Sequence, residues 1–537
     1  MPVPVIDLFA GPGGLGEGFA LLRDRRRDQP FFRLVLSIER DTVAHRTLTL
    51  RAVFRLLREN NELHHYYGFI RGEIDEHTFH RIPAVAMAFD QAAAEARCLE
   101  LGRAEESVVD QHIRSALQGA ATWVLIGGPP CQAYSIAGRS RRARDIGFQD
   151  DARHFLYREY LRIIREHRPA IFVMENVKGM LSSKHAGNPM FERILADLSA
   201  PGPGLEYEIR SFTRWSDNGL LEPVDYVIQS EHHGIPQNRH RVILLGVQRG
   251  LGLPRHRVLL PSPRIPTVLE AIGDLPPIRS RLSRGDSLDA WREAIRSFME
   301  RVRESGVDRM LGGLENVRVP ATPDSTGAAF IPWECGKAGK ATAIQARLRD
   351  RHLGGICQHE ARAHMPSDLA RYLFCSCFAK ACGFSPRLEM FPRDLLPDHI
   401  NVHTDRRGGA LPFADRFRVQ CANGPASTVV SHIAKDGHYY IHHDPAQCRS
   451  LTVREAARLQ TFPDNYFFMG NRTEQYIQVG NAVPPLLARQ LAGVVRGLLS
   501  AGAFEGSKWS VPAMLMQQDS GERLPDSLPE PAGGIGW

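Results

Sequence analysis

Short apolar runs, each ended by glycine, proline or an acidic residue, recur along the first half of the chain. Four of them are rich in aliphatic and β-branched residues and cover residues 3–9, 34–38, 123–126 and 170–174. Segments between them, such as 15–23 and 155–166, have the period of amphipathic helices. Strands that alternate with helices in this way predict an α/β fold with a doubly wound, mainly parallel sheet.

Two further patterns modify this picture. Residues 224–229 and 241–247 flank a Gly-Ile-Pro-Gln-Asn turn, which predicts a β-hairpin at the edge of the sheet. Residues from about 53 to 120 have helical periodicity and mixed charge, with no cluster of chemically active side chains. We interpret them as a helical insertion.

The amino-acid composition changes near residue 250, where the chain becomes rich in proline and arginine and loses its hydrophobic periodicity. Helical patterns return at 452–460 and 486–499. We therefore expect a main domain, a second and smaller region, a segment that returns to the main domain, and a Pro/Gly-rich tail that is disordered, at residues 1–250, 251–425, 426–503 and 504–537.

The composition fits a folded globular protein, with 43% hydrophobic and 24% charged residues among 537. The formal charge of +7 suits a polyanionic partner, and 60 of the 67 basic residues are arginine, which binds phosphate and guanine in a bidentate manner. A biased genome explains the arginine excess equally well. Nine cysteines make a poor disulfide framework, and neither a signal pattern nor a bilayer-length apolar stretch is present. We expect a cytoplasmic protein with no membrane role.

The first candidate site is the glycine-rich turn after the first predicted strand, Ala10-Gly11-Pro12-Gly13-Gly14. Glycines at a strand-to-helix turn allow the backbone to approach a ligand closely, and Glu39 at the end of the next strand could bind ribose hydroxyls. The spacing departs from the dinucleotide fingerprint Gly-x-Gly-x-x-Gly, so a nucleoside without pyrophosphate fits better. An ordinary tight turn is the alternative.

The second candidate site combines Cys131 and Glu175, each at the end of a predicted strand. The carboxyl ends of parallel strands converge on one crevice, so the thiol and the carboxyl could face one substrate. Nearby arginines could lower the pKa of the thiol and make it a nucleophile. The alternatives are a buried inert cysteine and a structural salt bridge.

Six segments, in order, resemble the motifs of the DNA cytosine-5 methyltransferases of bacterial restriction-modification systems. They are Asp7-Leu8-Phe9-Ala10-Gly11, Pro129-Pro130-Cys131-Gln132, Glu175-Asn176-Val177, Gln237-Asn238-Arg239-His240-Arg241, Arg449-Ser450-Leu451-Thr452-Val453-Arg454-Glu455 and Gly480-Asn481-Ala482-Val483-Pro484-Pro485. The resemblance spans residues 3–247 and 445–499. It implies that the main domain has the Rossmann-like fold of S-adenosylmethionine-dependent methyltransferases, and that 251–425 is the target-recognition region.

The resemblance implies S-adenosylmethionine as cofactor. Phe9 would stack on adenine, Gly11 and Gly13 would lie near the methionine part, and Glu39 would bind the ribose. The other implied cofactor-binding residues are Glu73, Ile74, Pro130, Asn481 and Val483. Glu73 stands where the family usually has Asp, and Tyr134 stands where its Pro-Cys-Gln-x-Phe-Ser motif has Phe.

The same resemblance implies the chemistry. The Cys131 thiolate would add to C6 of cytosine, so that C5 can attack the sulfonium methyl group. Glu175 would bind the exocyclic amine and N3, Arg241 would hold O2, and Arg239 would support Arg241. Since the target base is stacked inside a duplex, it must be flipped out. The implied substrate contacts are Gln132, Ser135, Arg153 and Asn176, and residues 136–150 would form a loop that closes over phosphates. The sequence does not identify the base that removes the C5 proton.

A zinc site is the remaining chemical hypothesis, and we decline it. Five cysteines and two histidines cluster in the second region, but none of the cysteines forms a Cys-x2-Cys pair: Cys335, Cys357, Cys375, Cys377, Cys382, His359 and His364. We expect no metal.

The predicted partners follow from the interpretation of this chain as a methyltransferase. We expect a monomer that acts on double-stranded DNA, with a separately encoded restriction endonuclease as a genetic partner. An RNA cytosine-5 methyltransferase is the rival enzyme, and a catalytically dead DNA-binding relative is the rival without activity. The long region 251–425 favours duplex DNA over RNA, and intact Cys131, Glu175 and Arg241 argue against the dead relative.

Overall fold

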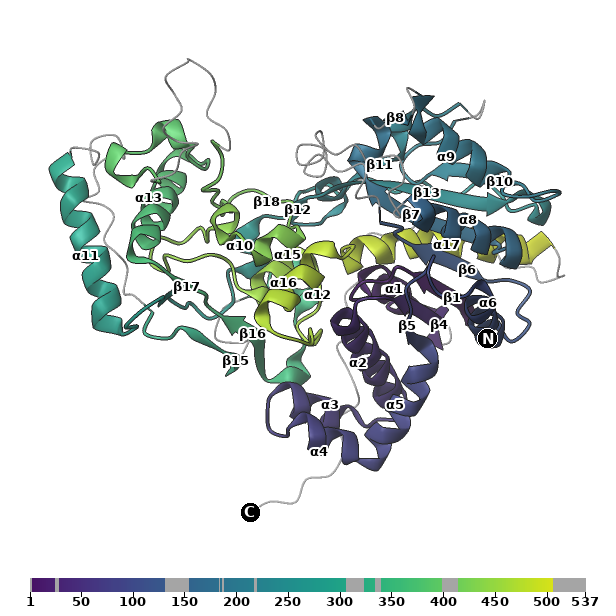
Figure 1. The fold of residues 1–537 in the computed structure, drawn as a ribbon, viewed down its shortest axis with the longest axis horizontal. Helices are drawn as coiled ribbons and strands as arrows, with labels where there is room; N and C mark the ends of the chain where they lie inside the picture. Colours follow the sequence, from purple (N-terminus) through teal and green to yellow (C-terminus); the bar gives the residue numbers. More distant parts are fainter. Residues whose placement is uncertain are drawn as a thin grey trace.

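A computed structural model describes the chain at residues 2–24, 29–130, 154–182, 184–185, 188–216, 220–305, 323–333, 340–397 and 414–505 (Figure 1). Within these residues, eight strands form one sheet in the order β10-β13-β7-β6-β1-β4-β5, and β11 also pairs with β13. The strands are β1 (Val3–Leu8), β4 (Phe32–Glu39), β5 (Ala96–Cys98), β6 (Val124–Gly127), β7 (Ile171–Val177), β10 (Tyr207–Ser211), β11 (Val227–Gln229) and β13 (His240–Gln248).

The five strands from β5 to β7 are parallel, and β13 runs antiparallel to β7, β10 and β11. This arrangement confirms the predicted mainly parallel α/β sheet. Because helices cover both of its faces, both sets of alternating side chains are buried, which explains the continuous apolar runs. Ile126 and Val173 belong to the core on one face, and Leu125 and Phe172 belong to the core on the other.

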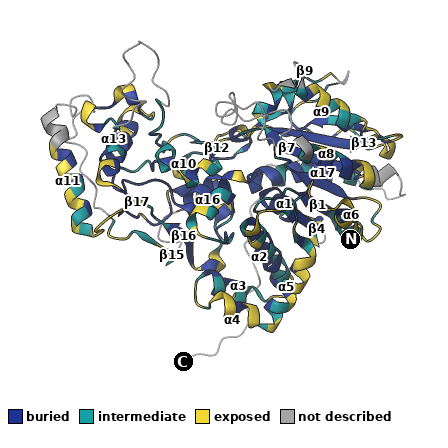
Figure 2. Ribbon diagram, viewed as in Figure 1, coloured by how far each residue is buried: buried dark blue, intermediate teal, exposed yellow. Residues whose placement is uncertain are grey.

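The helices are shared between the two faces. One face packs on α1 (Gly14–Ala20) and α17 (Pro485–Glu505), and the other packs on α6 (Glu106–Leu117), α8 (His154–His167) and α9 (Met190–Ser199). Figure 2 shows that the strands between these helices are buried along most of their length. The C-terminal segment therefore does return to the sheet, through α17.

The predicted hairpin at the sheet edge is confirmed. β11 pairs with β13 antiparallel and with no other described strand, so it lies on the outer side of the sheet. The sequence pattern missed β10, which pairs with the rest of the same side of β13. Its residues alternate polar with apolar, including Glu208 and Arg210, and so lack the continuous apolar run by which the other strands were recognised.

The stretch expected as a helical insertion contains more than helices, because β5 lies within it and extends the sheet beside β4. Four helices before β5 form an excursion from the sheet with a hydrophobic core of their own: α2 (Thr42–Glu59), α3 (Leu63–Ile70), α4 (Glu76–Arg81) and α5 (Pro83–Glu95). The fifth helix, α6, packs on β4 and so belongs to the sheet layers.

A second structured unit stands at one end of the molecule, away from the sheet (Figure 1). It is built on α11 (Leu288–Ser305) and α13 (Pro366–Cys382), which pack around Trp291, Tyr372 and Phe374. The unit is joined to the sheet domain through a set of short elements: α10 (Val268–Ile272), β14 (Arg281–Leu282), β15 (Gly327–Pro332), α12 (Ala343–Leu348), β16 (Gly355–Glu360), β17 (Ala363–His364), α15 (Val453–Leu459) and α16 (Arg472–Asn481).

Outside the large sheet, the described residues form five two-stranded pairings, of which β14 with β17 and β15 with β16 belong to the elements above, and three others follow. β2 (Arg23–Asp24) pairs with β3 (Gln29–Pro30), and β8 (Lys184–His185) pairs with β9 (Asn188–Pro189). The third pair, β12 (Gln237–Asn238) with β18 (Ala426–Ser427), links the start of β13 to the chain that leaves the second unit. Among the described helices, none is both long and apolar enough to cross a membrane.

Candidate active site

The carboxyl ends of the parallel strands bring the predicted site residues to one edge of the sheet. β1 leads into Phe9 and Gly11, β4 ends at Glu39, and Glu175 lies two residues before the end of β7. The register pairs Leu8 of β1 with Ile38 on one side and Gly127 on the other, so these strand ends are level. Residues far apart in the sequence therefore line one edge, as the pattern predicted.

Glu39 ties the glycine turn to the start of the next helix. Its Oε2 accepts a hydrogen bond from the backbone N–H of Gly11 at 2.8 Å, and its Oε1 accepts one from the N–H of Asp41 at 2.9 Å. Asp41 in turn caps α2. The Glu39 side chain is half-buried, so its carboxylate is held in place at the strand end while part of it stays accessible.

The glycine turn has a backbone that other residues would not adopt easily. Phe9, Gly11 and Gly13 all have positive φ angles, of 55°, 57° and 94°. A Cβ atom on Gly13 would lie 2.7 Å from Leu48 Cδ2 and 3.0 Å from Tyr466 Oη. Gly13 therefore has no room for a side chain, because the turn packs closely on Leu48 and Tyr466; we call residues 9–14 the cradle.

The C-terminal segment closes this cradle from the other side. A Cβ on Gly14 would lie 2.2 Å from the carbonyl oxygen of Val483, so the two backbones touch. Val483 is buried, and Asn481 is exposed at the end of α16. Both residues thus lie beside the glycine turn, where the resemblance placed them.

Glu73 and Ile74 are the one described part of the predicted cofactor set that the structure does not bring to this edge. α2 starts beside Glu39 and is 18 residues long, so it carries the chain about 27 Å away from the strand ends. Ile74 packs into the core of the helical excursion, and the Glu73 side chain is 59% exposed beside Arg71. We therefore withdraw these two residues from the cofactor site. The chain returns at β5, whose next residue, Leu99, donates its N–H to the Glu39 carbonyl at 3.1 Å.

Glu175 and Arg241 form a partly buried ion pair at the same sheet edge. Arg241 Nε donates to Glu175 Oε1 at 2.9 Å, and each side chain is 14% exposed. Burial lowers the pKa of Arg241, and the negative charge of Glu175 opposes that shift. A Cβ on Gly128 would lie 3.1 Å from Glu175 Oε2, so a glycine here leaves room for the carboxylate.

Asn176 fastens the loop that leads to the predicted nucleophile. Its side-chain amide donates to the carbonyl oxygen of Pro129 at 3.2 Å, and its own oxygen accepts from the N–H of Val177 at 2.8 Å. Pro130 is the last described residue of this loop. Four predicted residues lie outside the described part of the chain, namely Cys131, Gln132, Ser135 and Arg153, and so does the predicted loop 136–150.

Arg239 makes contacts different from those of Arg241. Its guanidinium is 2% exposed and donates to the carbonyl oxygens of Val429 at 2.8 Å and Gly480 at 3.3 Å. Burial, together with the nearby charge of Arg241, lowers the pKa of Arg239 to about 9. Arg239 thus connects β13 to two segments of the C-terminal third of the chain.

Residues 426–430 are a part of the site that sequence reasoning missed. β18 pairs with β12 next to Arg239, and Thr428 Oγ1 donates to the carbonyl oxygen of Asn238. The N–H of Val429 donates to Gln237 Oε1 at 2.7 Å. Nothing in the local pattern marks this short polar stretch, because only the pairing with β12 brings it to the site.

The candidate zinc ligands are dispersed among the described residues and serve other contacts. Cys357 Sγ lies 3.2 Å from the carbonyl oxygen of Ile70, Cys375 and Cys377 are buried in α13, and His359 is hydrogen-bonded to Thr452 and to the Pro276 carbonyl. Cys382 is exposed, His364 is buried against Ser450, and Cys335 lies outside the described residues.

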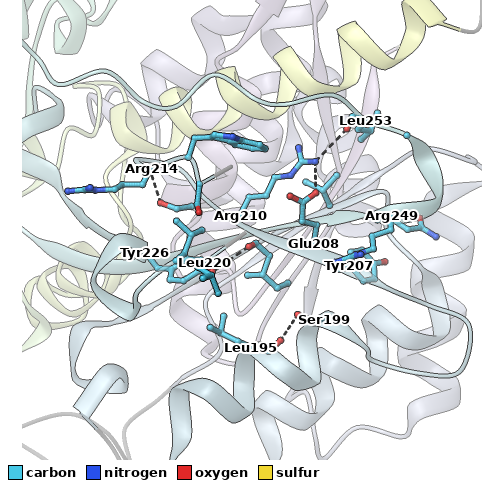
Figure 3. A pocket seen from close by; sticks show the side chains of 18 residues that line it. Leu195, Ser199, Tyr207, Glu208, Arg210, Arg214, Leu220, Tyr226, Arg249 and Leu253 are labelled. Carbon is cyan, nitrogen blue, oxygen red and sulfur yellow. Dashed lines mark hydrogen bonds and ion pairs between the residues drawn. The ribbon is translucent and has the colours of Figure 1, made fainter. Parts of the chain in front are cut away.

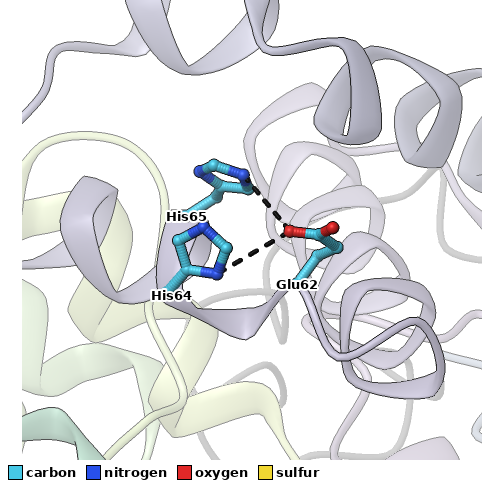
Figure 4. A group of neighbouring side chains, drawn as sticks. All are labelled: Glu62, His64 and His65. Atoms are coloured by element: carbon cyan, nitrogen blue, oxygen red, sulfur yellow. Dashed lines mark ion pairs between the residues drawn. The ribbon is translucent and has the colours of Figure 1, made fainter.

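Two other features of the described residues lie away from this edge. A cavity of about 710 Å³ runs along the edge strand β10, lined by residues such as Tyr207, Arg210 and Trp215 (Figure 3). It contains none of the motif residues, so we do not assign the cofactor to it. Glu62, His64 and His65 converge at the start of α3, with histidine nitrogens 3.7 and 3.4 Å from one carboxylate oxygen (Figure 4). His64 is exposed and Glu62 and His65 are half-buried, and we assign no ligand to this group.

Comparison with known proteins connects this geometry to a family. A profile described as C-5 cytosine-specific DNA methylase matches residues 98–318 and 393–496. The type II methyltransferase M.Bpa9945I of Bacillus paralicheniformis is 32% identical over 518 residues, which cover 92% of this chain and 99% of the relative. The type II methyltransferase M.AgeI of Thalassovita gelatinovora is 28% identical, with coverage of 92% and 99%. A solved structure of a prophage-encoded E. coli protein, described as a DNA modification methyltransferase, has a TM-score of 0.52 at 19% identity and covers 93% of this chain and 99% of its own, a likeness of fold.

Proposed function

The chain belongs to the C-5 cytosine-specific DNA methylase family and is a DNA (cytosine-5-)-methyltransferase, and we propose that it methylates a flipped-out cytosine within one short sequence of double-stranded DNA. The donor in this proposal is S-adenosylmethionine, and the reaction passes through a transient bond between Cys131 and C6 of the base. The relatives are named type II methyltransferases, so we also propose that the chain protects DNA from a separately encoded restriction endonuclease.

The observation that carries the proposal is the Glu175–Arg241 pair at the end of β7. The carboxylate and the guanidinium provide an acceptor and a donor side by side, which suits the amine and N3 of cytosine together with its O2. Asn176, next to Glu175, holds Pro129 by a hydrogen bond, and Cys131 follows two residues later. The chain that leads to Cys131 is therefore anchored beside the carboxylate as far as Pro129, which supports the proposed role of Cys131.

The cofactor fits the strand-end cradle. The backbone turn around Gly11 and Gly13 leaves no room for a Cβ at Gly13, and the half-buried Glu39 carboxylate stands where ribose hydroxyls can reach it. S-adenosylmethionine supplies an electrophilic methyl group when bound. We propose that Phe9, Gly11, Gly13, Glu39, Pro130, Asn481 and Val483 hold it.

The proposed reaction assigns one task to each group. The Cys131 thiolate adds to C6 while Glu175 favours protonation of N3, so that negative charge does not accumulate on the ring. C5 would then take the methyl group as its bond to the sulfonium sulfur breaks, which leaves a neutral thioether. A base would remove the C5 proton, N3 would lose the proton it had gained, and the thiolate would leave C6 as the C5–C6 double bond re-forms. Arg241 holds O2, and Arg239 fixes β13 by holding the carbonyls of Val429 and Gly480.

We assign sequence recognition to the second unit. Its helices α11 and α13 lie within 251–425 and stand away from the sheet (Figure 1). The proposed catalytic and cofactor-binding residues lie outside that range of the sequence. Reading base edges requires a few polar side chains held in a groove, which a separate unit beside the flipped base can supply.

The test is expression of the chain in a host without cytosine methylation, followed by bisulfite sequencing of genomic DNA. We expect 5-methylcytosine at one short sequence and no signal from a Cys131→Ser variant made in parallel. Genomic DNA without 5-methylcytosine, although the folded protein is present, would refute the proposal. Methylation confined to RNA would transfer the activity to the rival substrate.

A further inference from the structure

We infer that helix α3 (Leu63–Ile70) and Arg71, which caps its C-terminal end, form a brace that fixes the angle of the recognition unit relative to the catalytic sheet. The inference rests on the proposed function and goes beyond it, because it gives a role to the helical excursion, which bears no catalytic motif. Tyr67 and Arg71 are positioning residues in this account, and neither touches the cofactor or the reacting base.

The first observation is a set of hydrogen bonds from Arg71 to the recognition side. Arg71 Nε donates to the carbonyl oxygen of Leu353 at 2.9 Å, and Arg71 Nη2 donates to that of His352 at 2.5 Å. A charged guanidinium that satisfies two backbone carbonyls fixes both the position and the direction of the chain it holds.

The second observation is a polar junction one turn earlier on the helix. Tyr67 Oη donates to Asp350 Oδ2 at 2.6 Å, and Asn465 Nδ2 donates to the same oxygen, also at 2.6 Å. Asn465 is itself held by Arg51, which forms a buried ion pair with Glu17 of α1. A continuous chain of contacts thus runs from a helix on the catalytic sheet to Asp350.

The held segment leads directly into the recognition unit. Residues 350–353 are followed by β16, and only five residues separate the end of β16 at Glu360 from the start of α13 at Pro366. Leu353 and Cys357 are fully buried in the hydrophobic core of the excursion, among residues of α2, α3 and α5. Through Cys357, β16 therefore packs against the excursion, while its neighbour Ile356 belongs to the core shared with the sheet.

The functional consequence follows from the place where DNA must lie. A duplex read by the recognition unit must present its flipped cytosine to Glu175 on the sheet, so the two parts need one fixed spacing. Loosening the brace would lower the fraction of molecules in the binding-competent orientation, and apparent affinity for DNA falls by that fraction. Bound DNA restores the orientation, so the chemical step should proceed at its normal rate.

The test compares Arg71→Ala with Arg46→Ala, which removes an arginine from the same excursion. Arg46 pairs with Glu76 at the surface and has no contact with residues 350–357 among those described. With cognate DNA we expect the KM of Arg71→Ala to rise about tenfold, with kcat, the dissociation constant of S-adenosylmethionine and the methylated sequence unchanged. Arg46→Ala should match the wild type. Arg71→Lys, which can reach one of the two carbonyls, should give an intermediate KM.

Tyr67→Phe keeps the test decisive if Arg71→Ala fails to fold, because it removes a single hydroxyl and should raise the KM in the same direction. A lower melting temperature with an unchanged KM would show that α3 is only structural and would overturn the inference. A changed methylated sequence, or a loss confined to kcat, would also overturn it. Failure of the proposed function would be visible separately, since the wild-type enzyme would then be inactive in the same assay.

Discussion

The catalytic sheet and the junction with the recognition unit are built from different interactions. In the sheet, buried strands are almost wholly apolar, and successive side chains enter two hydrophobic cores. At the junction the buried groups include ion pairs, of which Arg449–Glu455 has both side chains 1% exposed and Arg458–Asp464 has side chains 0% and 1% exposed. The sheet is therefore specified by local patterning, whereas the junction depends on particular pairs of charges.

This difference has a consequence for catalysis. The strand ends hold Glu39, Glu175 and Arg241 by contacts made within the sheet domain. The recognition unit must be held in one orientation relative to those strand ends. Directional contacts such as salt bridges and hydrogen bonds fix the angle between two parts of a protein better than apolar packing does. The following predictions test whether the sheet carries the chemistry while the junction fixes the orientation of the recognition unit.

The largest effect should come from the proposed nucleophile. Cys131→Ser should abolish methyl transfer while largely preserving binding of cofactor and DNA, because a hydroxyl stays protonated where a thiol is partly ionised. Transfer of labelled methyl groups to DNA measures the activity, and calorimetry measures the binding. Cys382→Ser, an exposed cysteine at the end of α13, is the matched control and should keep wild-type activity. Substantial methyl transfer by Cys131→Ser would refute the covalent route.

The next effect concerns stability at the junction. Glu455→Gln leaves the buried Arg449 without its charge partner, and removing one member of a buried pair costs about 3–5 kcal/mol. Arg449 and His442 hold the pKa of Glu455 well below its usual range, against the effect of burial. Ile243→Val in the sheet should cost only about 0.5–1.5 kcal/mol. Urea unfolding measures both, and equal losses would remove the contrast between the two regions.

A moderate effect is expected in the cofactor cradle. Glu39→Ala should weaken S-adenosylmethionine binding by about 1–3 kcal/mol, which is typical for lost hydrogen bonds to a charged acceptor. Glu59→Ala at the other end of α2, where Glu59 makes an exposed pair with Arg33, is the control. Isothermal calorimetry measures both affinities. An unchanged dissociation constant for Glu39→Ala would move the ribose contact elsewhere.

Effects of the same size, about 1–3 kcal/mol of discrimination for each side chain that reads a base edge, should arise in the recognition unit. Arg387 and Arg393 are exposed beside the core of this unit, and Arg406 and Arg407 lie outside the described residues. Alanine variants should form two groups, one that relaxes the preferred sequence and one that weakens binding to all sequences with a shallower salt dependence. Bisulfite profiles that stay unchanged across residues 280–425 would place recognition elsewhere.

The two regions also differed in how far the sequence predicted them. Apolar runs ended by glycine or acidic residues located β1, β4, β6 and β7. They therefore also placed Glu39 and Glu175 at the carboxyl ends of two strands of one sheet. The pattern failed at β10, which alternates polar residues, and at β5, which has only three residues. Glu73 was misplaced because a two-residue match carries no strand signal, and α2 takes that stretch away from the sheet.

Many contacts of the junction could not be predicted because they join residues more than a hundred positions apart, although the pairs Arg449–Glu455 and Arg458–Asp464 are each only six positions apart. Arg239 meets Val429, and Arg71 meets Leu353, through backbone carbonyls that any residue type provides. No local periodicity encodes such pairs. Long-range hydrogen bonds of this kind become visible only in the folded chain.

The most direct test of the central claim is covalent trapping on DNA that contains 5-fluorocytosine at the methylated position. Fluorine cannot leave C5 as a proton does, so the enzyme should remain bonded to the base after methyl transfer. We predict a denaturant-stable protein–DNA adduct that needs S-adenosylmethionine, with the modified peptide containing Cys131. Absence of the adduct in an active preparation, or a bond to any residue other than Cys131, would contradict the account.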